Sequence, residues 1–330
     1  MRIVLRADSS HRIGLGHVAR CTRLAVELSR LLPDAELILV TNQPETARFF
    51  RRKQDFIRIH PCGDGSGIEP VKELQPDLAV LDLLDLEADD VQSLRGTCVV
   101  ADIENVAPET SCAHLLLLRI GTLPPPGTNG QVVLAGPQYL LIDPAWALEP
   151  LVRSDFPTTG LRVFLALGGS DPSGLTSLAL EACAETADLW EEVRVILGPG
   201  YEGGSPVEPR LAGKLQVFRL PPDVRGVARG MDMAVVAAGL QLFECLAAGL
   251  PCVTLRHNET QRGNAALAVE WNAAVDLGPG DSVAPEILVG LLRRLAADPD
   301  RRRSMSQAGR RNVDGLGLRR LARAIVEVLP

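Results

Sequence analysis

One histidine near the start of the chain stands between two glycines and a helical segment. Gly14 and Gly16 precede His17, and from Val18 onward apolar residues recur at the spacing of an amphipathic helix. The positive end of a helix disfavours imidazolium, so we expect a neutral ring that can accept a proton from water or a hydroxyl. A histidine that only caps or packs the helix is the alternative. Asp8, from the same segment, is the second candidate base.

A pair of glycines follows an apolar run in the middle of the chain. Gly168 and Gly169 come directly after Leu161–Leu167, and Ser170 separates them from a helical segment. Glycines let backbone N–H groups approach an anion, and the positive end of the following helix adds to the attraction. We therefore predict a loop that binds a diphosphate, with an ordinary tight turn as the alternative.

A third segment repeats the order of strand, glycine turn and helix. Its predicted nucleotide-binding residues are Ala238, Gly239, Leu240, Gln241, Glu244 and Gln261. Glu244 follows Gln241 by one helical turn, and the two acceptor oxygens of a carboxylate suit the paired hydroxyls of a ribose. The alternative is a solvated helix residue, which the apolar neighbours of Glu244 disfavour.

The elements around these residues alternate between short apolar runs and helical patterns, which is typical of parallel sheets covered by helices. A Pro- and Gly-containing stretch over 136–157 separates two such series, so we predict an α/β protein with domains 1–150 and 151–330. Two Rossmann-like domains are expected to face each other across a cleft, with ligands at the carboxyl ends of the strands. The expected strands are Ile3–Leu5, Glu36–Val40, Leu78–Leu81, Cys98–Ala101, Leu161–Leu167, Val193–Leu197, Leu215–Phe218, Met233–Val236, Cys252–Leu255 and Ala274–Leu277.

Two cofactor classes are disfavoured. The spacing from Gly14 through Gly16 to Ala19 formally matches a dinucleotide fingerprint, but seven residues separate it from the first strand, and the second strand ends in Thr41 without an acidic residue. NAD is therefore not expected. Asp298 and Asp300 form a DxD pattern between two helices, where a capping turn is favoured, and no metal site is predicted.

Composition limits the partners. The net charge of −7 and the pI near 5.4 argue against general nucleic-acid binding. The seven cysteines are scattered without a CxxC pair, and no apolar stretch approaches the ~18 residues of a membrane span, so we expect a cytoplasmic protein without stable membrane insertion. Arginines at helical spacing between Arg293 and Arg323 favour a solvated helix face, with peripheral contact to an anionic membrane as the alternative.

At several points the sequence resembles a known family. The run from Arg6 to Cys21, with Gly14, Gly16 and His17, resembles the opening of the UDP-sugar hydrolases of the pseudaminic acid pathway and of the related spore coat polysaccharide synthesis proteins. The similarity continues at 136–141, 167–172 and 238–261, so it spans most of the chain. The last segment is also similar to the inverting GlcNAc transferase of peptidoglycan synthesis.

The resemblance implies a GT-B fold whose C-terminal half binds UDP and whose N-terminal half holds the sugar. It further implies a UDP-sugar hydrolase in which His17 activates a water that inverts the anomeric carbon, while the Ser170 loop stabilises the departing UDP without a metal. A glycosyltransferase with an acceptor hydroxyl in place of water, and a non-catalytic nucleotide-sugar binding partner, remain as alternatives. The tyrosine that the hydrolases usually carry after the strand ending at Asp82 is absent, since Leu83 and Leu84 follow it, so the sugar is not predicted.

Overall fold

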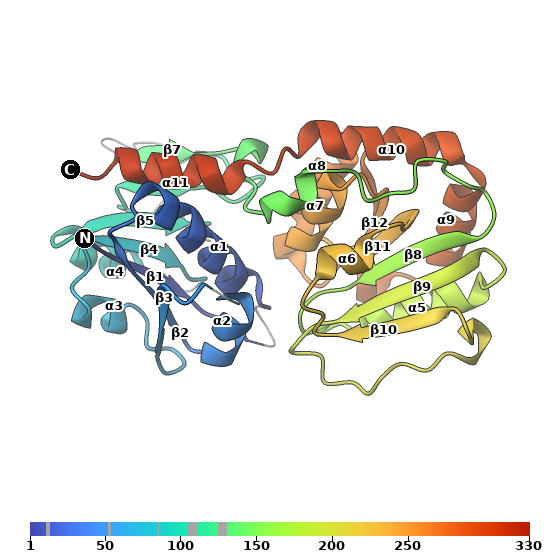
Figure 1. Ribbon diagram of the computed structural model, residues 1–330, viewed down its shortest axis with the longest axis horizontal. Helices are drawn as coiled ribbons and strands as arrows, with labels where there is room; N and C mark the ends of the chain where they lie inside the picture. Colours follow the sequence, from blue (N-terminus) through green and yellow to red (C-terminus); the bar gives the residue numbers. More distant parts are fainter. Residues whose placement is uncertain (11–13, 52–53, 85, 105–110, 125–130) are drawn as a thin grey trace. The chain divides into compact units, whose positions relative to one another are not determined.

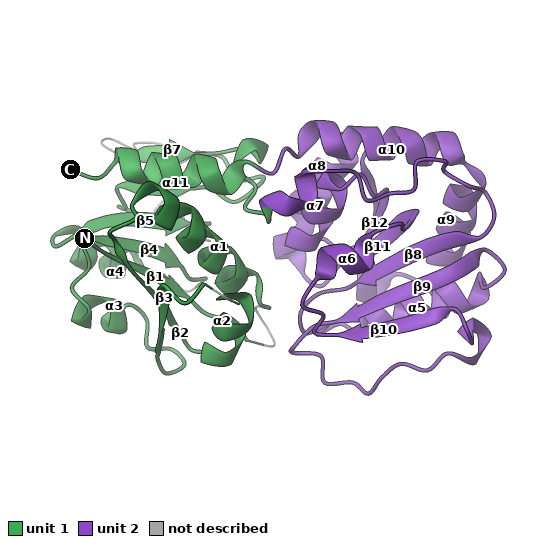
Figure 2. Cartoon of the chain, in the orientation of Figure 1, with its two compact units in different colours: residues 1–143, 316–330 green, residues 144–315 purple. Residues whose placement is uncertain are grey.

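The chain folds into two compact units. The computed structural model describes residues 1–10, 14–51, 54–84, 86–104, 111–124 and 131–330 (Figure 1). Unit 1 comprises Met1–Asp143 and Leu316–Pro330, and unit 2 comprises Pro144–Gly315 (Figure 2).

Unit 1 is built on a parallel sheet whose centre is the first strand. The strand order is β3-β2-β1-β4-β5-β6-β7, so β1 (Arg2–Ala7) lies beside β4 (Leu78–Asp82). The chain adds β2 and β3 on one side of β1, and then β4 to β7 on its other side. Parallel neighbours need crossover connections, which here include helices. The other elements are β2 (Glu36–Thr41), β3 (Ile57–Pro61), β5 (Val99–Ile103), β6 (Leu115–Leu117), β7 (Val132–Leu134), α1 (Gly16–Leu31), α2 (Pro44–Arg51), α3 (Glu69–Glu73), α4 (Ala88–Arg95), η2 (Pro137–Tyr139) and α11 (Gly317–Glu327).

The two faces of this sheet carry separate apolar layers. Ile3 and Leu5 belong to a buried cluster that includes residues of α1 and α11, whereas Val4 belongs to a cluster with residues of α3 and α4. Such a strand, buried on both faces, reads as a continuous apolar run. Arg6 interrupts the run of β1, although its side chain is also fully buried.

Unit 2 repeats this topology. Its strand order β10-β9-β8-β11-β12-β13 makes β8 (Leu161–Ala166) and β11 (Met233–Ala237) the central pair, and a core cluster joins the sheet to α5 (Leu175–Glu185) and α9 (Pro285–Ala297). The point where the direction of strand addition reverses is the usual ligand position in such sheets. The other elements are β9 (Trp190–Leu197), β10 (Leu215–Arg219), β12 (Cys252–Arg256), β13 (Ala274–Pro279), α6 (Val224–Ala228), α7 (Leu240–Ala247), α8 (Arg262–Glu270), α10 (Pro299–Asn312), η3 (Pro144–Ala147), η4 (Pro209–Leu211), η5 (Glu259–Gln261) and η6 (Gly280–Ser282).

The predicted strands are confirmed, with ends that differ by a few residues. Strands β3, β6 and β7 were not predicted. β6 and β7 have three residues each, too few to establish a periodicity, and β3 lies at the edge of its sheet with a mixed apolar and polar sequence.

The predicted boundary after residue 150 needs correction. The first crossing between the units follows Asp143, and Leu316–Pro330 returns to unit 1 instead of completing the second domain. α11 packs on α1, with Leu321 and Ile325 fully buried in the shared core cluster. The periodicity of α11 predicts a helix with an apolar face, but does not say which sheet covers that face.

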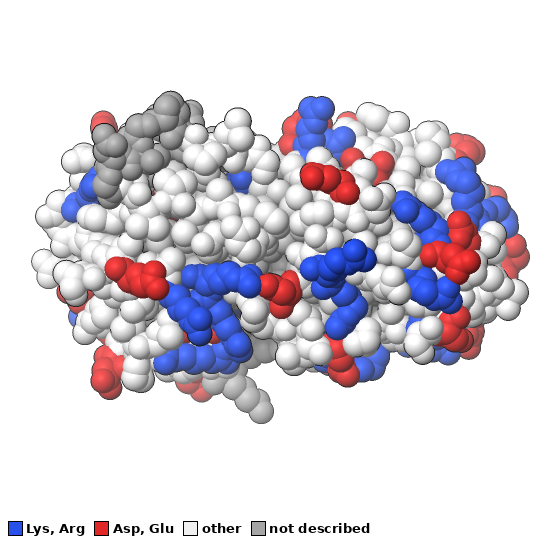
Figure 3. Space-filling model, turned by 90° about the horizontal axis from the view of Figure 1, so that it is seen from above, with Lys and Arg blue, Asp and Glu red and all other residues white. Residues whose placement is uncertain are grey.

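The arginines expected on a solvated helix face do not all lie there. Arg302 of α10 is fully buried and donates hydrogen bonds to Leu295 O (2.9 Å) and Ala296 O (3.3 Å), and also to Pro157 O. Arg293 lies at the surface in an ion pair with Asp188. Figure 3 shows basic side chains gathered in groups with acidic ones beside them. No helix in the described part of the chain is long and apolar enough to cross a membrane.

The return of α11 to unit 1 predicts where a core mutation acts. Leu321→Ala removes buried apolar contact between α11 and α1 and should cost about 2–5 kcal/mol. Hydrogen–deuterium exchange should then speed up in β1 and α1 and stay unchanged in β8 and α5. Leu316→Ala, at a position that is 38% exposed, is the matched control. Faster exchange confined to unit 2 would contradict the division of the chain.

Candidate functional site

The first site lies where β1 and β4 meet. Ala7 at the end of β1 pairs in register with Asp82 at the end of β4, and the chain leaves β1 toward α1, which begins at Gly16. Gly14 has a positive φ of 77°, a conformation natural to glycine, and its N–H donates to Ser10 O at 2.9 Å. Residues 11–13 of the same motif, His11 among them, lie outside the described residues. His17 is thus in the first turn of α1, as predicted.

His17 forms a short hydrogen bond with a carboxylate that the sequence interpretation did not select. Its Nδ1 lies 2.6 Å from Asp82 Oδ1. The His17 side chain is 13% exposed, whereas the Asp82 side chain is fully buried. Arg20, one turn further along α1, donates from Nε to Asp82 Oδ2 and from Nη2 to Asp82 Oδ1, both at 2.6 Å. Three side chains from α1 and β4 therefore converge at the carboxyl edge of the sheet.

The charge on Asp82 follows from this geometry. Burial by itself would raise the pKa of the Asp82 carboxyl, but the Arg20 guanidinium and His17 outweigh burial and hold that pKa well below its usual range. An ionised carboxylate only accepts hydrogen bonds, so the shared proton belongs to His17 Nδ1. In the neutral imidazole this assignment leaves Nε2 as the acceptor nitrogen.

Arg20 also contacts a second carboxylate. Its Nη1 pairs with Glu104, which follows β5, and its Nη2 lies 3.3 Å from His17 Nδ1. Burial alone would lower the pKa of Arg20, but Asp82 and Glu104 raise it above its ordinary value. Arg119, which follows β6, donates to Glu104 O at 3.4 Å, and burial lowers the pKa of Arg119. Glu104 and Arg119 each follow a strand at the edge of the sheet where Asp82 ends β4.

Asp8, the second candidate base, lies in a different ion pair. The buried Arg6 guanidinium donates to both of its carboxylate oxygens, at 2.8 Å for Nη2 to Oδ2, and also to Gly67 O at 2.9 Å. The backbone N–H of Asn42 donates to Asp8 Oδ1 at 3.1 Å. The ion pair of Arg6 and Asp8 thus links the end of β1 to the turn after β2 through Asp8 and to the turn before α3 through Arg6.

In unit 2 the predicted glycine loop follows β8. Gly168 is exposed and has a positive φ of 107°, and a Cβ at this position would lie 3.1 Å from His257 Nε2. Gly169 packs against the turn at Gly198–Gly200. Its carbonyl accepts a hydrogen bond from the Gly200 N–H at 2.9 Å, and a Cβ on Gly198 would lie only 2.3 Å from the same oxygen. The positive φ and the nearby His257 therefore favour glycine at position 168, and the Gly169 carbonyl leaves no room for a side chain at Gly198.

The start of α5 differs from the prediction. The backbone N–H groups of Leu175 and Thr176 donate to the two carboxylate oxygens of Asp171, at 2.8 and 2.9 Å. These amides were expected to attract a diphosphate, and a protein carboxylate takes them instead. Ser170 is buried. Of the predicted loop residues Gly168, Gly169 and Ser170, Gly168 is the exposed one.

The first backbone N–H groups of α7, unlike those of α5, are not taken by a carboxylate of the described residues. Gly239 precedes the helix, and no side chain from the described part of the chain caps it. Ala238 is buried, and Leu240 and Gln241 are half-buried in the first turn. The first N–H groups of an uncapped helix attract anions. The predicted residues Gly239, Leu240 and Gln241 thus lie on the more suitable helix end.

Of two further predicted residues, one lies within α7 and the other lies near its start. Glu244 lies one turn after Gln241 and is buried, with 5% exposure. Gln261 accepts from the backbone N–H of His257 at 2.9 Å, and its Nε2 would lie 3.9 Å from a Cβ on Gly239. The structure thus brings Gly239 and Gln261 close together at the carboxyl edge of the second sheet.

His257 was not predicted as part of this edge. It follows β12, and its Nε2 lies 2.6 Å from Leu167 O, so its N–H at this atom donates to the carbonyl before Gly168. The side chain therefore reaches the end of β8 past the end of β11, since β11 separates β8 from β12 in the sheet. Its position directly after an apolar strand is the sequence feature that could have indicated a place at this edge.

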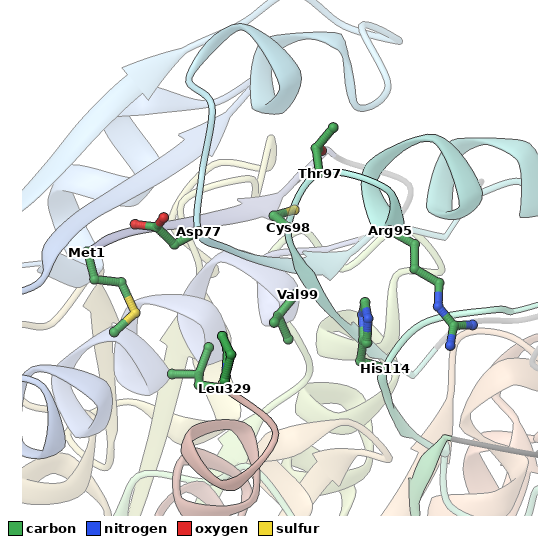
Figure 4. Close-up of a pocket in the computed structure, with 9 residues that line it drawn as sticks. Met1, Asp77, Arg95, Thr97, Cys98, Val99, His114 and Leu329 are labelled. Carbon is green, nitrogen blue, oxygen red and sulfur yellow. The ribbon is translucent and has the colours of Figure 1, made fainter.

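A hollow of about 680 Å³ lies at the other edge of the first sheet. It is lined by residues that precede or begin β4, β5 and β6, among them Asp77, Thr97 and His114 (Figure 4). None of the predicted site residues lines it. Ligands of sheets with this topology bind outside the carboxyl ends of the strands, so the hollow does not mark the candidate site. Among the described residues, no group of three or more His, Cys, Asp and Glu could hold a metal ion.

Comparison with solved structures defines the fold. The chain has the GT-B fold of glycosyltransferases, with TM-scores of 0.67 to MurG from Acinetobacter baumannii and 0.67 to the spinosyn forosaminyltransferase SpnP. Identities are 16% and 13%, and each alignment covers 99% of both chains.

Among curated proteins, the chain is similar to the spore coat polysaccharide biosynthesis protein SpsG of Bacillus subtilis, with 26% identity over 97% of this chain and 96% of that protein. This similarity agrees with the spore coat part of the predicted resemblance, whereas the pseudaminic acid hydrolase remains a prediction. No protein-family model matches the chain.

The depressed pKa of Asp82 predicts a pH-dependent contribution to stability. A carboxyl whose folded-state pKa lies below its unfolded value stabilises the fold above the unfolded value, about 3.9, and this stabilisation is lost as pH falls below it. Asp82→Asn should therefore lower the midpoint of thermal unfolding strongly at about pH 7 and progressively less toward about pH 3. Asp281→Asn, at an exposed position in unit 2, is the control. A difference between parent and Asp82→Asn that stays constant with pH would contradict the assignment.

Proposed function

We propose that the chain is an inverting glycosyltransferase that takes a UDP-sugar as donor in polysaccharide assembly, with His17 as its general base. The observation that carries the proposal is the 2.6 Å bond between His17 Nδ1 and Asp82, which directs the acceptor lone pair to Nε2. The GT-B fold and the similarity to SpsG support the substrate class.

The proposed reaction needs one proton acceptor in unit 1. Nε2 of His17 takes the proton of an acceptor hydroxyl as its oxygen attacks the anomeric carbon. The bond between that carbon and the diphosphate oxygen breaks, UDP leaves with the electron pair, and the anomeric configuration is inverted. Asp82 stabilises the imidazolium that forms, because its carboxylate accepts the Nδ1 proton in both states of the ring.

Unit 2 supplies the groups that we propose for UDP. The uncapped start of α7, with Gly239, Leu240 and Gln241, would hold the diphosphate together with the exposed backbone of Gly168. Glu244 would accept from the ribose hydroxyls, with Gln261 and Ala238 beside the same edge. We assign Ser170 and Gly169 to the shape of the loop, since one is buried and the other packs against Gly198.

Hydrolysis of a UDP-sugar is the second candidate. The motif from Arg6 to Cys21 favours it through its resemblance to the pseudaminic-pathway hydrolases, and water would replace the acceptor hydroxyl at the same base. Asp8 stays the second candidate base, although its pair with Arg6 suits a role in holding the loop before α1. A purely binding role does not account for a histidine whose proton is directed by a buried carboxylate.

One assay separates these functions. Purified protein is incubated with a panel of UDP-sugars, and release of UDP is measured with and without added sugar and lipid-linked acceptors. Release that depends on an acceptor supports the transferase, and equal release in water alone supports the hydrolase. Binding of UDP without turnover of any panel member would favour the binding protein.

Loss of the base predicts a specific kinetic change. His17→Ala should lower kcat by about 10²–10⁴-fold, the usual contribution of general-base assistance, while the affinity for UDP stays nearly unchanged. His60→Ala, on the edge strand β3, is the matched control. Turnover of a confirmed substrate by His17→Ala at nearly the parental rate would move the base to Asp8.

Removal of the proposed ribose ligand should weaken nucleotide binding. Calorimetry with UDP should show a loss of about 1–3 kcal/mol in Glu244→Gln, because the carboxylate acceptor is removed from hydroxyls that it would pair with. Glu286→Gln, an exposed glutamate of α9 in the same unit, should bind UDP as the parent does. Equal affinity in Glu244→Gln and the parent would remove Glu244 from the site.

A further inference from the structure

His17, the proposed base, lies beside more charged groups than a pair of histidine and aspartate requires. Arg20 meets both oxygens of Asp82 and also Glu104, and Arg20 and Asp82 are buried. Taking charges out of water costs several kcal/mol per ion, and hydrophobic replacements of such pairs are often neutral or stabilising. The arrangement therefore calls for a role besides stability.

The chemistry of a buried carboxyl supplies that role. With only a neutral imidazole beside it, a fully buried Asp82 would favour its protonated form, because burial disfavours the charge. A carboxyl that takes a proton from solvent would donate it to His17 Nδ1, and the one proton of the neutral ring would then lie on Nε2. In that tautomer Nε2 could no longer accept a proton from a nucleophile.

Arg20 keeps Asp82 ionised and so prevents this change of tautomer. Its Nε and Nη2 donate to Oδ2 and Oδ1 of Asp82, at 2.6 Å each, so both oxygens face a cation. A guanidinium stays charged and has no acceptor, so it cannot take the proton itself. The bidentate contact also orients Oδ1, the oxygen that His17 Nδ1 meets.

Glu104 completes the charge balance. Of the described residues, the charged groups that interact within this cluster are the cations Arg20 and Arg119 and the anions Asp82 and Glu104. The Cys21 thiol, which donates to Asp82 Oδ2 at 3.6 Å, stays neutral because burial raises its pKa. Without Glu104, the Arg20 charge 3.3 Å from Nδ1 would oppose the imidazolium that forms during the reaction.

We propose that Arg20 is the positioning residue that keeps the proton of neutral His17 on Nδ1 and Nε2 ready to accept, and that Glu104 holds and balances Arg20 in this role. The inference rests on the proposed function only in calling His17 the base. The tautomer itself is a property of the free protein.

The first test measures the tautomer without substrate. In protein labelled with ¹⁵N-histidine, the nitrogen chemical shifts distinguish Nδ1–H from Nε2–H, and the His17 signals are those lost in His17→Gln. The parent should show Nδ1–H. Arg20→Gln keeps a donor without the charge and should shift His17 toward Nε2–H, whereas Arg20→Lys keeps the charge and should largely retain Nδ1–H. An unchanged tautomer in folded Arg20→Gln overturns the proposal.

A second measurement needs no change at Arg20. The ¹³Cγ signal of Asp82 in the parent should stay at the carboxylate position well below the ordinary aspartate pKa of about 3.9. Titration near that ordinary value would overturn the proposal even if Arg20→Gln failed to fold. The signals of His60 and His114 report whether each variant keeps its fold.

The kinetic test separates positioning from binding. Arg20→Gln should lower kcat by about 10–100-fold, less than loss of the base, with KM for the UDP-sugar unchanged, and Arg20→Lys should recover part of kcat. Removing the cation favours imidazolium, so the acid limb of the pH profile should move to higher pH in Arg20→Gln and to lower pH in Glu104→Gln. Shifts of the same sign in both variants would overturn the charge balance.

The two proposals fail in different ways. If no UDP-sugar is turned over while the tautomer responds to Arg20→Gln, the proposed function fails and the role of Arg20 stands. If turnover depends on His17 but the tautomer does not respond, the role of Arg20 fails alone.

Discussion

The carboxylate of Asp82 is fully removed from water and remains charged, and the arrangement of unit 1 around it follows from that constraint. Its charge is compensated by Arg20 from α1, and Arg20 in turn contacts Glu104 from the end of β5. These partners meet only if β1, β4 and β5 are neighbours in parallel, with α1 starting where β1 ends. This set of charges is therefore assembled at the point where strand addition reverses, which is also the usual ligand position in such sheets.

The second unit has the same topology and uses its reversal point differently. Around β8 and β11 the groups are mostly backbone atoms and small residues: Gly168 with its positive φ, the tight contact of Gly169 with Gly198, and the uncapped start of α7. The charged side chain at the start of α5, Asp171, is turned inward onto helix amides. In the proposed reaction, unit 1 would supply the proton acceptor and unit 2 the backbone donors, and cleavage of a sugar diphosphate needs both.

Local patterns were sufficient for most of the fold and for part of the site. Apolar runs predict the strands around β1, β4, β8 and β11, and the position of His17 at the start of a helix marks it as a candidate base. Asp82, Arg20 and Glu104 were missed because their significance lies in pairing across β1, β4 and β5, which a pattern along the chain does not encode. Signals existed nonetheless, since Asp82 ends an apolar strand and Arg20 follows His17 by one turn. The role of Asp171 as a cap and the burial of Arg302 likewise depend on which backbone groups the fold brings near them.

The path of the chain through the units has a consequence for how the protein is made. Unit 2 is a continuous segment, Pro144–Gly315, whereas the core of unit 1 includes Leu318, Leu321 and Ile325 from the last helix. During synthesis from the N-terminus, the sheet of unit 1 emerges first, but its layer over α1 stays open until Leu316–Pro330 leave the ribosome. Unit 2 has all of its residues before then and can fold while unit 1 still waits for its final helix. The unit that begins first is thus completed after the other, and the apolar face that α11 covers stays open until the residues of unit 2 have been synthesised.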